Sequence, residues 1–529
     1  MCVRPGNRND HEGAAVGNVA LFEAGVDART VLSGFRQELH SCLTARADAL
    51  FELTDGLLCA EGRVVSPVEV TLLPEHRRGH DALYGGLNHG HIEVDRLRTL
   101  SAGLPMPRFA DGRLVLAVDV SAWLRSDAAC SPERLFCHVY GRARNASQFI
   151  PGWPYSFVAV LEPGRSSWTA ILDVIRLGPS DDATAVTATQ LRGVVEQLIT
   201  SGQHRPGDPD IVIVTDAGYD VTRLAWKLRD LPVELVGRVR SDRVMRLPKP
   251  PRLPGANGRP PKHGPEFHLA RPETWTEPTV TTTTDTTNYG KACAQAWDRI
   301  HPRLTHRAAW LEHPGALPVI EGTLIRLEVE HLSKDRDAPP VWLWSSKPGA
   351  TAADVDRWWQ AFLRRFDLEH TFRFWKQTLG WTRPRLRSPE AADRWTWLLV
   401  AAHTQLRLAR PLAVDLRRPW EPPTDHSTLT PARVRRGFRN IRATTVIAGR
   451  MFRNPRLTRE GVRRPGAAGF SHGRRRSSTR PRARRSWVWA AITIQVQRSA
   501  VSGVRILGRF QPRVCSINRN VCSRSNLRR

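Results

Sequence analysis

The spacing of apolar residues along the chain changes several times, and each change predicts a different kind of element. Residues 19–58 carry apolar side chains at helical intervals, which predicts helices at the start of the chain. Residues 114–121 and 210–216 instead contain runs of consecutive apolar residues, which predict short buried strands. The apolar part of each run ends at an aspartate, Asp119 in the first run and Asp216 in the second.

The patterns between and after these two runs predict a layered domain. Two strands joined by a turn, an amphipathic helix, a second helix and a further strand are expected at residues 157–162, 168–175, 185–202, 221–231 and 233–239. Strands that alternate with helices in this way pack as an α/β domain, here a mixed sheet flanked by helices.

The chain then becomes rich in proline, glycine and threonine. Residues 246–289, which include a loop at 258–264 and a threonine tract at 279–287, are expected to form loops rather than core. Strand patterning returns at residues 317–332 and 341–345. This stretch is therefore expected to combine loops with a few strands.

One long helix, expected at residues 354–379, carries most of the candidate chemistry. Aromatic side chains surround it on all sides, which is typical of a buried helix. Four residues fall on one stripe of this helix: Phe362, Arg365, Glu369 and Lys376. The stripe is either a solvated pattern of i,i+4 charges or a set of buried charges whose partners are metal ions or phosphates.

Charge is distributed unevenly along the 529 residues. Residues 431–529 contain 26 arginines, no lysine or aspartate and one glutamate, and so hold +25 of the formal net charge of +28. Such a segment is either a basic DNA-binding tail or an out-of-frame translation of a GC-rich gene. The second interpretation is favoured, because arginine recurs there without lysine and almost without acidic partners.

The remaining composition excludes several classes of protein. The eight cysteines form no C-x-x-C pair, which argues against a zinc site or a disulfide framework. The chain has no signal-peptide pattern and no apolar run long enough for a membrane span, so no membrane contact is expected and a cytoplasmic protein is predicted.

Asp119, Asp216 and Glu369 are the candidate catalytic and metal-binding residues. Strand ends are where α/β folds place their sites, and three carboxylates that meet there can hold two Mg²⁺ or Mn²⁺ ions. Arg365 and Lys376 would then bind DNA phosphates beside the metals. Two alternatives stay open: the aspartates are ordinary strand-end caps, or other carboxylates take part. The competing carboxylates are Asp127, Asp208, Asp210, Asp220 and Asp367.

The helical motif resembles the signature of cut-and-paste DDE transposases of bacterial insertion sequences, Tyr-x2-Arg-x3-Glu-x6-Lys. The chain matches three of the four positions, as Phe362-x2-Arg365-x3-Glu369-x6-Lys376. Phe362 replaces the tyrosine of that group and lacks the hydroxyl that would contact a DNA phosphate. This departure weakens one expected DNA contact but leaves the expected metal site unchanged.

The aspartate motifs of the same group match in Leu116-Ala-Val-Asp119 and in Val212-Ile-Val-Thr-Asp216. The resemblance implies an RNase H-like catalytic domain in two parts, separated by a β-rich insertion. The expected domains are a mainly helical domain that binds DNA ends at 1–108, the two catalytic parts at 109–245 and 346–430, the insertion at 246–345, and a disordered or frameshifted arginine-rich tail at 431–529.

The resemblance implies a bacterial DNA transposase that binds the ends of its element, cleaves them and joins the 3′-hydroxyls to target DNA. The expected partners are double-stranded DNA and a second copy of the chain, as a homodimer in the DNA complex. The alternatives are an RNase H-like nuclease without strand transfer and an inactive, DNA-binding remnant. Arg259 and Lys262, in a loop similar to arms that enter the DNA minor groove, are further candidate DNA contacts, with a solvated linker as the alternative.

Overall fold

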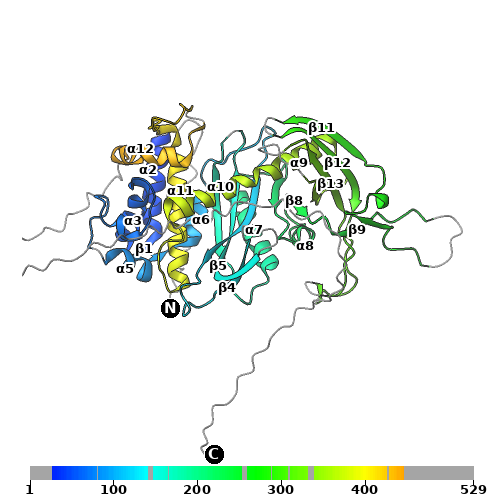
Figure 1. Cartoon of the computed structure of the whole chain (residues 1–529), viewed down its shortest axis with the longest axis horizontal. Helices are drawn as coiled ribbons and strands as arrows, with labels where there is room; N and C mark the ends of the chain where they lie inside the picture. Colours follow the sequence, from blue (N-terminus) through cyan, green and yellow to red (C-terminus); the bar gives the residue numbers. More distant parts are fainter. Residues whose placement is uncertain are drawn as a thin grey trace, which may run out of the picture. The chain divides into compact units, whose positions relative to one another are not determined.

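The computed structural model (Figure 1) describes residues 27–445, apart from gaps at 80, 141–146, 165, 253–258, 287–288, 308–309, 312, 332–338 and 426–427. These residues belong to the unit Met1–Ala491, and a second unit, Ile492–Arg529, lies outside them. The predictions for residues 19–26 and for the arginine-rich segment beyond residue 445 also lie outside the described residues.

Within the described residues, ten strands form one sheet in the order β11-β12-β13-β14-β8-β7-β3-β5-β4, with β6 also paired to β5. The three strands β3, Val115–Leu124, β7, Ile211–Thr215, and β8, Val233–Val239, run parallel to one another. All five residues of β7 are buried, as expected for a parallel strand covered on both faces. The other pairings are antiparallel, so the predicted mixed sheet is confirmed.

The long strand β5, Ser147–Leu161, organises one side of the sheet. Its first part pairs with β4, Leu135–Tyr140, and its last part with β6, Thr169–Arg176. The pairing with β6 confirms the predicted hairpin. The prediction that the first apolar strand stops at Asp119 is wrong, because β3 keeps pairing with β5 as far as Leu124.

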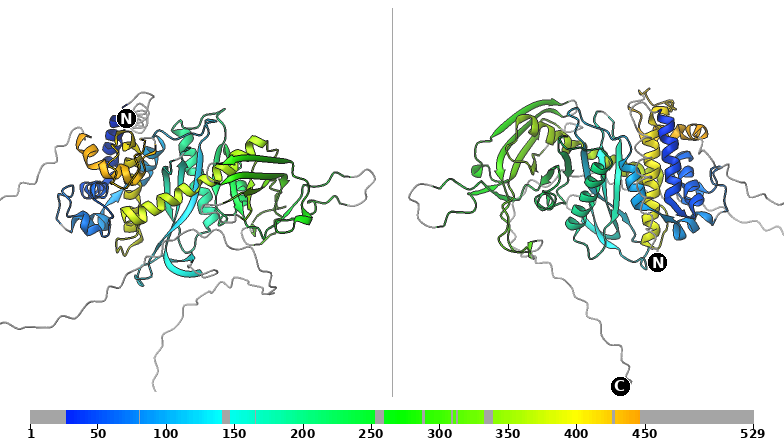
Figure 2. Two further views of the ribbon diagram at one scale, coloured as in Figure 1. Left: turned by 45° about the horizontal axis from the view of Figure 1, so that its top comes forward. Right: turned by 180° about the vertical axis from the view of Figure 1, so that it is seen from behind.

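Side chains alternate along each strand, so the sheet has two faces, and helices cover both. The helices α7 and α8 cover one face, and α9, α10 and α11 cover the other. Figure 2 shows α9 and α10 nearly end to end across the second face. The bounds are Ala183–Thr200 for α7, Val221–Lys227 for α8, Ala352–Arg364 for α9, Phe366–Phe374 for α10 and Pro389–Ala409 for α11.

The insertion adds strands to the central sheet, because β14 pairs directly with β8. The strands β11 to β14 span Val280–Thr286, Gly290–Ile300, Gly322–Val329 and Val341–Ser345. A separate pair, β9 and β10, spans Val244–Arg246 and Glu266–His268, followed by a 3-10 turn at Pro272–Thr274.

The prediction that the threonine tract is a loop is wrong, because it forms the edge strand β11. Threonine is β-branched and fits a pleated strand, and alternate hydroxyls of a strand share one face. The hydroxyls of Thr282 and Thr284 donate to the Asp356 carboxylate of α9 at 2.6 and 3.1 Å. The tract therefore attaches the insertion to the helix that leads into the candidate site.

The N-terminal helices pack against α11 and α12, as Figure 1 shows. The bounds are Ala28–Cys42 for α2, Ala47–Cys59 for α3, Pro67–Val70 for α4, Ala82–His89 for α5, Val94–Ala102 for α6 and Pro431–Thr444 for α12, with short strands β1 and β2 at Leu43–Ala45 and His91–Ile92 and a 3-10 turn at Arg410–Leu412. The two ends of the described chain thus form one helical bundle.

Buried polar groups join the helices of this bundle. Arg36 of α2 donates to both oxygens of Asp55 on α3, at 2.7 and 3.0 Å, and to Gln405 of α11 at 2.5 Å. Arg442 of α12 donates to the same Asp55 at 2.6 Å. The prediction that the arginine-rich tail begins at residue 431 is therefore wrong, because residues 431–444 are a helix of the bundle.

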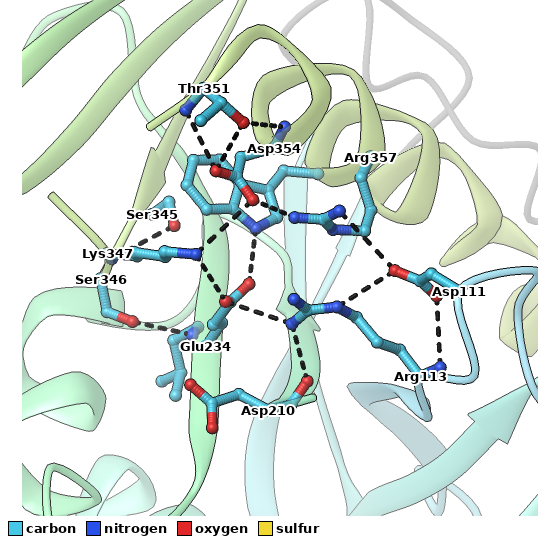
Figure 3. Close-up of polar contacts among 12 residues, drawn as sticks. Asp111, Arg113, Asp210, Glu234, Ser345, Ser346, Lys347, Thr351, Asp354 and Arg357 are labelled. Atoms are coloured by element: carbon cyan, nitrogen blue, oxygen red, sulfur yellow. Dashed lines mark hydrogen bonds and ion pairs between the residues drawn. The ribbon is translucent and has the colours of Figure 1, made fainter. Parts of the chain in front are cut away.

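A second buried network lies around Glu234, at the start of β8 (Figure 3). The Glu234 side chain is 3% exposed and accepts a hydrogen bond from Trp358 of α9 at 2.9 Å. It forms ion pairs with Arg113 at 3.2 Å and with Lys347 at 3.4 Å. Because a buried carboxylate is stable only when it is paired, Glu234 depends on these partners.

The same network reaches the first turn of α9. Asp354 closes a capping box with Thr351 and forms ion pairs with Lys347 at 3.6 Å and with Arg357. Arg357 in turn lies 3.6 Å from Asp111. The start of α9 is thus fixed to β8 and to the segment that precedes β3.

No helix among the described residues is long and apolar enough to cross a membrane.

Replacing Glu234 by alanine is expected to lower the free energy of unfolding by at least about 2 kcal/mol, because the buried Trp358 N–H would lose its acceptor and Arg113 its most buried counter-charge. Urea denaturation followed by tryptophan fluorescence measures this change. Glu328→Ala is the control, since its carboxylate pairs with Arg326 at a half-exposed position and should cost less than about 1 kcal/mol. Equal losses in the two variants would contradict a stabilising role for the Glu234 network.

A chain that ends at residue 445 is expected to melt at the temperature of the full chain, and one that ends at residue 430 to melt well below it. The shorter chain loses α12, and burial of Val434, Phe438 and Ile441 contributes about 1.5–3 kcal/mol for each side chain. It also leaves Asp55 without Arg442. Differential scanning calorimetry of the three proteins distinguishes these outcomes, and a stable 430-residue chain would contradict the bundle described here.

Candidate active site

Two neighbouring parallel strands set the positions of Asp119 and Asp216. Val118 of β3 lies beside Thr215, the last residue of β7, so Asp119 in β3 and Asp216 directly after β7 are also neighbours. Because side chains alternate along a strand, both aspartates share the sheet face that α9 and α10 cover.

The helical segment that carries Glu369 crosses this face. The single helix predicted for residues 354–379 is interrupted at Arg365, which lies as one turn residue between α9 and α10. The Arg365 N–H donates to the Phe362 carbonyl, and the Leu368 N–H donates to the Arg365 carbonyl, so the helix tightens here to three-residue bonds. Arg365 and Glu369 keep their i,i+4 relation across this turn.

The guanidinium of Arg365 contacts all three candidate carboxylates. Its Nη1 donates to Asp119 Oδ2 at 2.6 Å, and its Nη2 lies 3.2 Å from Glu369 Oε1 and 4.0 Å from Asp216 Oδ1. The Arg365 side chain is only 1% exposed, and the Phe362 ring centre lies 5.8 Å from its guanidinium carbon. The partners of this buried charge are therefore carboxylates of the same chain, where the sequence had suggested metal ions or phosphates.

The electrostatics of these groups are coupled. Burial raises the pKa of Asp119 to about 6 and the pKa of Glu369 to about 7, against the opposing effect of Arg365. The neighbouring Asp216 raises both pKa values further. Burial also lowers the pKa of Lys376 to about 8, and Asp119 partly offsets this change. Ionisable groups perturbed in this way by burial and by one another are typical of functional sites.

Lys376 lies at the end of the helical segment, in the π-helical turn Trp375–Leu379. Its ammonium nitrogen is 5.5 Å from the centre of the Trp381 ring, which favours the charged form near an aromatic face. The turn ends at Gly380, where φ is 73° and a Cβ would approach the Val64 carbonyl oxygen to 2.7 Å. Glycine is therefore required at this position if the lysine is to keep its place.

Arg238 is a nearby cation that the sequence analysis missed. It follows Gly237 on β8, and Gly237 lies beside Thr215, the residue before Asp216. Burial lowers the pKa of Arg238, and the charge of Asp216 opposes this change. Its place becomes evident only from the pairing of β7 with β8, which no local sequence pattern reveals.

A second missed feature is the loop at residues 382–388, in which arginines alternate with apolar residues. Arg385 and Arg387 are exposed, whereas Leu386 is buried and its carbonyl accepts a hydrogen bond from Arg125 at 2.5 Å. Neither exposed arginine has an ion-pair partner within the described part of the chain. Since Arg125 directly follows β3, the loop is attached to the strand that carries Asp119. The alternation of arginines with apolar residues after Gly380 was the sequence pattern that could have revealed this loop.

The cluster can be tested for its fit to a divalent metal. Asp216 Oδ1 is buried and has no hydrogen-bond partner among the described residues, so this acceptor is available to a cation. Carboxylate oxygens are the ligands that Mg²⁺ and Mn²⁺ prefer. As the side chains stand, no three acidic, histidine or cysteine residues of the described segments are grouped closely enough to hold a metal. The donor chemistry fits a divalent metal, provided that the Arg365 guanidinium moves away from the three carboxylates.

The other two predicted DNA-binding residues lie on the insertion. The Lys262 ammonium donates to the Leu317 carbonyl, and Arg259 is exposed. Gly258, which precedes them, lies outside the described residues. No contact between these two side chains and the carboxylate cluster is found in the described segments.

The competing carboxylates have other surroundings. Asp220 caps α8, Asp208 accepts the Arg205 N–H at 2.9 Å, Asp127 pairs with Arg125 at 3.4 Å, Asp367 pairs with Arg364 at 2.7 Å, and Asp210 is exposed at the opposite end of β7 from Asp216. None of the five is a partner of Arg365.

Comparison with known proteins gives three results. No curated protein matches the chain. Among solved structures, a cryo-EM structure of the piggyBac transposase synaptic complex with hairpin DNA is 10% identical, with a TM-score of 0.35, over 82% of this chain and 75% of that one. The family model of the DDE superfamily endonucleases matches residues 38–303, just over half of the chain, a range that includes Asp119 and Asp216 and ends before α10. The chain therefore belongs to the DDE superfamily endonucleases.

Proposed function

We propose that the chain is a DNA transposase that cleaves phosphodiester bonds at Asp119, Asp216 and Glu369 and then joins the 3′-hydroxyls to target DNA. The observation that carries this proposal is the meeting of the three carboxylates at one buried guanidinium, in a member of the DDE superfamily endonucleases. The strand order β6-β5-β3-β7-β8, with β5 antiparallel, supports an RNase H-like catalytic core.

The roles of the residues follow from the elements that hold them. Asp119 lies in β3 and Glu369 in α10, while Asp216 directly follows β7, so each proposed metal ligand is held in or next to regular secondary structure. Mg²⁺ or Mn²⁺ bound there would activate the attacking water or 3′-hydroxyl and stabilise charge on the phosphate. Lys376, whose charge interacts with that of Asp119, would neutralise an oxygen of the reacting phosphate.

Double-stranded DNA is the proposed substrate. Lys376 and Arg238 lie beside the carboxylates, and Arg385 and Arg387 extend the positive charge onto an exposed loop attached to β3. Arginines without protein partners bind phosphates well, because their forked donors match phosphate oxygens. A homodimer on the two ends of an element, with further contacts from Arg259 and Lys262, completes the proposal.

Each of the variants Asp119→Asn, Asp216→Asn and Glu369→Gln is expected to lower DNA cleavage by more than about a hundredfold, because each removes one charged ligand oxygen. The measurement is nicking and joining of a plasmid that carries the gene with its flanking DNA, in the presence of Mg²⁺ or Mn²⁺.

Asp210→Asn is the matched control, since Asp210 is an exposed aspartate at the other end of the same strand and should leave cleavage unchanged. Full cleavage by any of the three site variants would refute the proposed triad. Cleavage by the unmodified chain without joining would favour the nuclease alternative, and the absence of both would favour the inactive remnant.

The double variant Arg385→Ala/Arg387→Ala is expected to weaken binding to duplex DNA regardless of sequence. The slope of log K against log salt concentration should fall by about 2, since each phosphate contact contributes about 0.9. Fluorescence anisotropy titrations at several salt concentrations measure this slope. Arg240→Ala is the control, because this exposed arginine is already paired with Asp242 at 2.7 Å. An unchanged slope in the double variant would exclude the loop from the DNA-binding surface.

A further inference from the structure

Arg365 combines deep burial with three acidic neighbours, and this sets it apart from an ordinary phosphate-binding arginine. Its side chain is 1% exposed, and the ring centres of Phe362 and Phe366 lie 5.8 and 5.0 Å from its guanidinium carbon. The two rings and the three carboxylates thus set its orientation while no metal or DNA is bound. Its Nε is buried without a hydrogen-bond partner in the described segments, so its bonding is directed through the two terminal nitrogens.

Those two nitrogens contact the oxygens that a metal would need. They lie 2.6 Å from Asp119 Oδ2, 3.2 Å from Glu369 Oε1 and 4.0 Å from Asp216 Oδ1. A divalent cation bound by these oxygens would stand within a few ångströms of the guanidinium, where like charges repel strongly in a buried site. The guanidinium and the metal therefore compete for one set of ligands.

The guanidinium also has a function when no metal is present. Three carboxylates that approach one another in a buried site repel, and a buried charge without a counter-charge is strongly destabilising. Arg365 supplies this counter-charge and so holds the three side chains in place. When it leaves, it needs another anion, and a DNA phosphate at the site offers matching acceptor oxygens.

We propose that Arg365 is the resident cation of the carboxylate cluster, and that it exchanges these carboxylates for a DNA phosphate when the divalent metal binds. The inference rests on the proposed function. In the free protein Arg365 positions the three carboxylates. In the DNA complex it couples metal binding to DNA binding. By linkage, DNA then raises the affinity for metal by the same factor by which metal raises the affinity for DNA.

The first test is Mn²⁺ binding to the full chain without DNA, measured by the electron paramagnetic resonance signal of free Mn²⁺. Arg365→Gln, which removes the competing charge, is expected to bind Mn²⁺ at least about tenfold more tightly than the unmodified chain. Without metal, the same variant is expected to melt at a lower temperature, and Mn²⁺ should restore its stability. Unchanged or weaker Mn²⁺ binding by this variant would overturn the proposal.

Controls separate this inference from the proposed function. Arg373→Gln, an exposed arginine of α10, should leave Mn²⁺ binding unchanged. Asp216→Asn should abolish the binding; if it has no effect, the ions bind elsewhere and the proposed metal site itself fails. If Asp216→Asn abolishes binding but Arg365→Gln does not strengthen it, only the exchange is refuted.

A second variant covers the case in which Arg365→Gln does not fold. Arg365→Lys keeps the charge but has no forked donors, so it can hold fewer carboxylates, and Mn²⁺ should bind more tightly than to the unmodified chain. Equal affinity in the two proteins would overturn the exchange.

The phosphate half of the proposal is tested with a short duplex of random sequence at saturating concentration. The duplex should raise the Mn²⁺ affinity of the unmodified chain by about fivefold or more and raise that of Arg365→Gln by a clearly smaller factor. An equal response in both proteins, or no response in the unmodified chain, would overturn this half.

Discussion

The central constraint on this structure is electrostatic: three carboxylates meet in a largely buried place and require a positive charge between them. Arg365 supplies that charge from inside the protein, with one guanidinium shared among Asp119, Asp216 and Glu369. Burial and mutual repulsion still hold the pKa values of Asp119 and Glu369 above their ordinary range. Arg365 therefore only partly offsets the effect of burial, and the charges of Lys376 and Arg238 also act on this cluster.

The fold meets this constraint by placing acidic groups on rigid elements and the cation at an irregular one. The aspartates lie at neighbouring positions on paired strands, which fixes the distance between them. Arg365, in contrast, is the single turn residue between α9 and α10. At this break the helix tightens to three-residue hydrogen bonds, which sets the direction in which the Arg365 side chain leaves the backbone.

The parts of the fold with strong local patterns were predictable from sequence. The hairpin of β5 and β6 and the strand that leads to Asp216 follow from apolar runs bounded by turn residues. The threonine tract was misjudged, because its backbone pairs with β12 and its hydroxyls bind Asp356 of a helix far along the chain. Residues 431–444 were misjudged for a related reason, since their arginines find acceptors such as Asp55 far away in the sequence. Composition alone cannot reveal partners of this kind.

The candidate site, too, was predictable from sequence only in part. Motif spacing identified Asp119, Asp216, Glu369 and Arg365 as candidate site residues. It could not show that the arginine binds the three carboxylates. That assignment depends on how α9 is fixed in space. At its start, Asp354 and Trp358 join the network around Glu234, at the beginning of β8.

At its end, α9 leads into Arg365, beside the opposite end of the strands that carry the aspartates. In the same first turns, Asp356 binds the helix to the insertion through Thr282 and Thr284. The start of α9 is therefore held both by β8 and by the insertion. The insertion, which contributes none of the three carboxylates, is thus part of the physical support of the site.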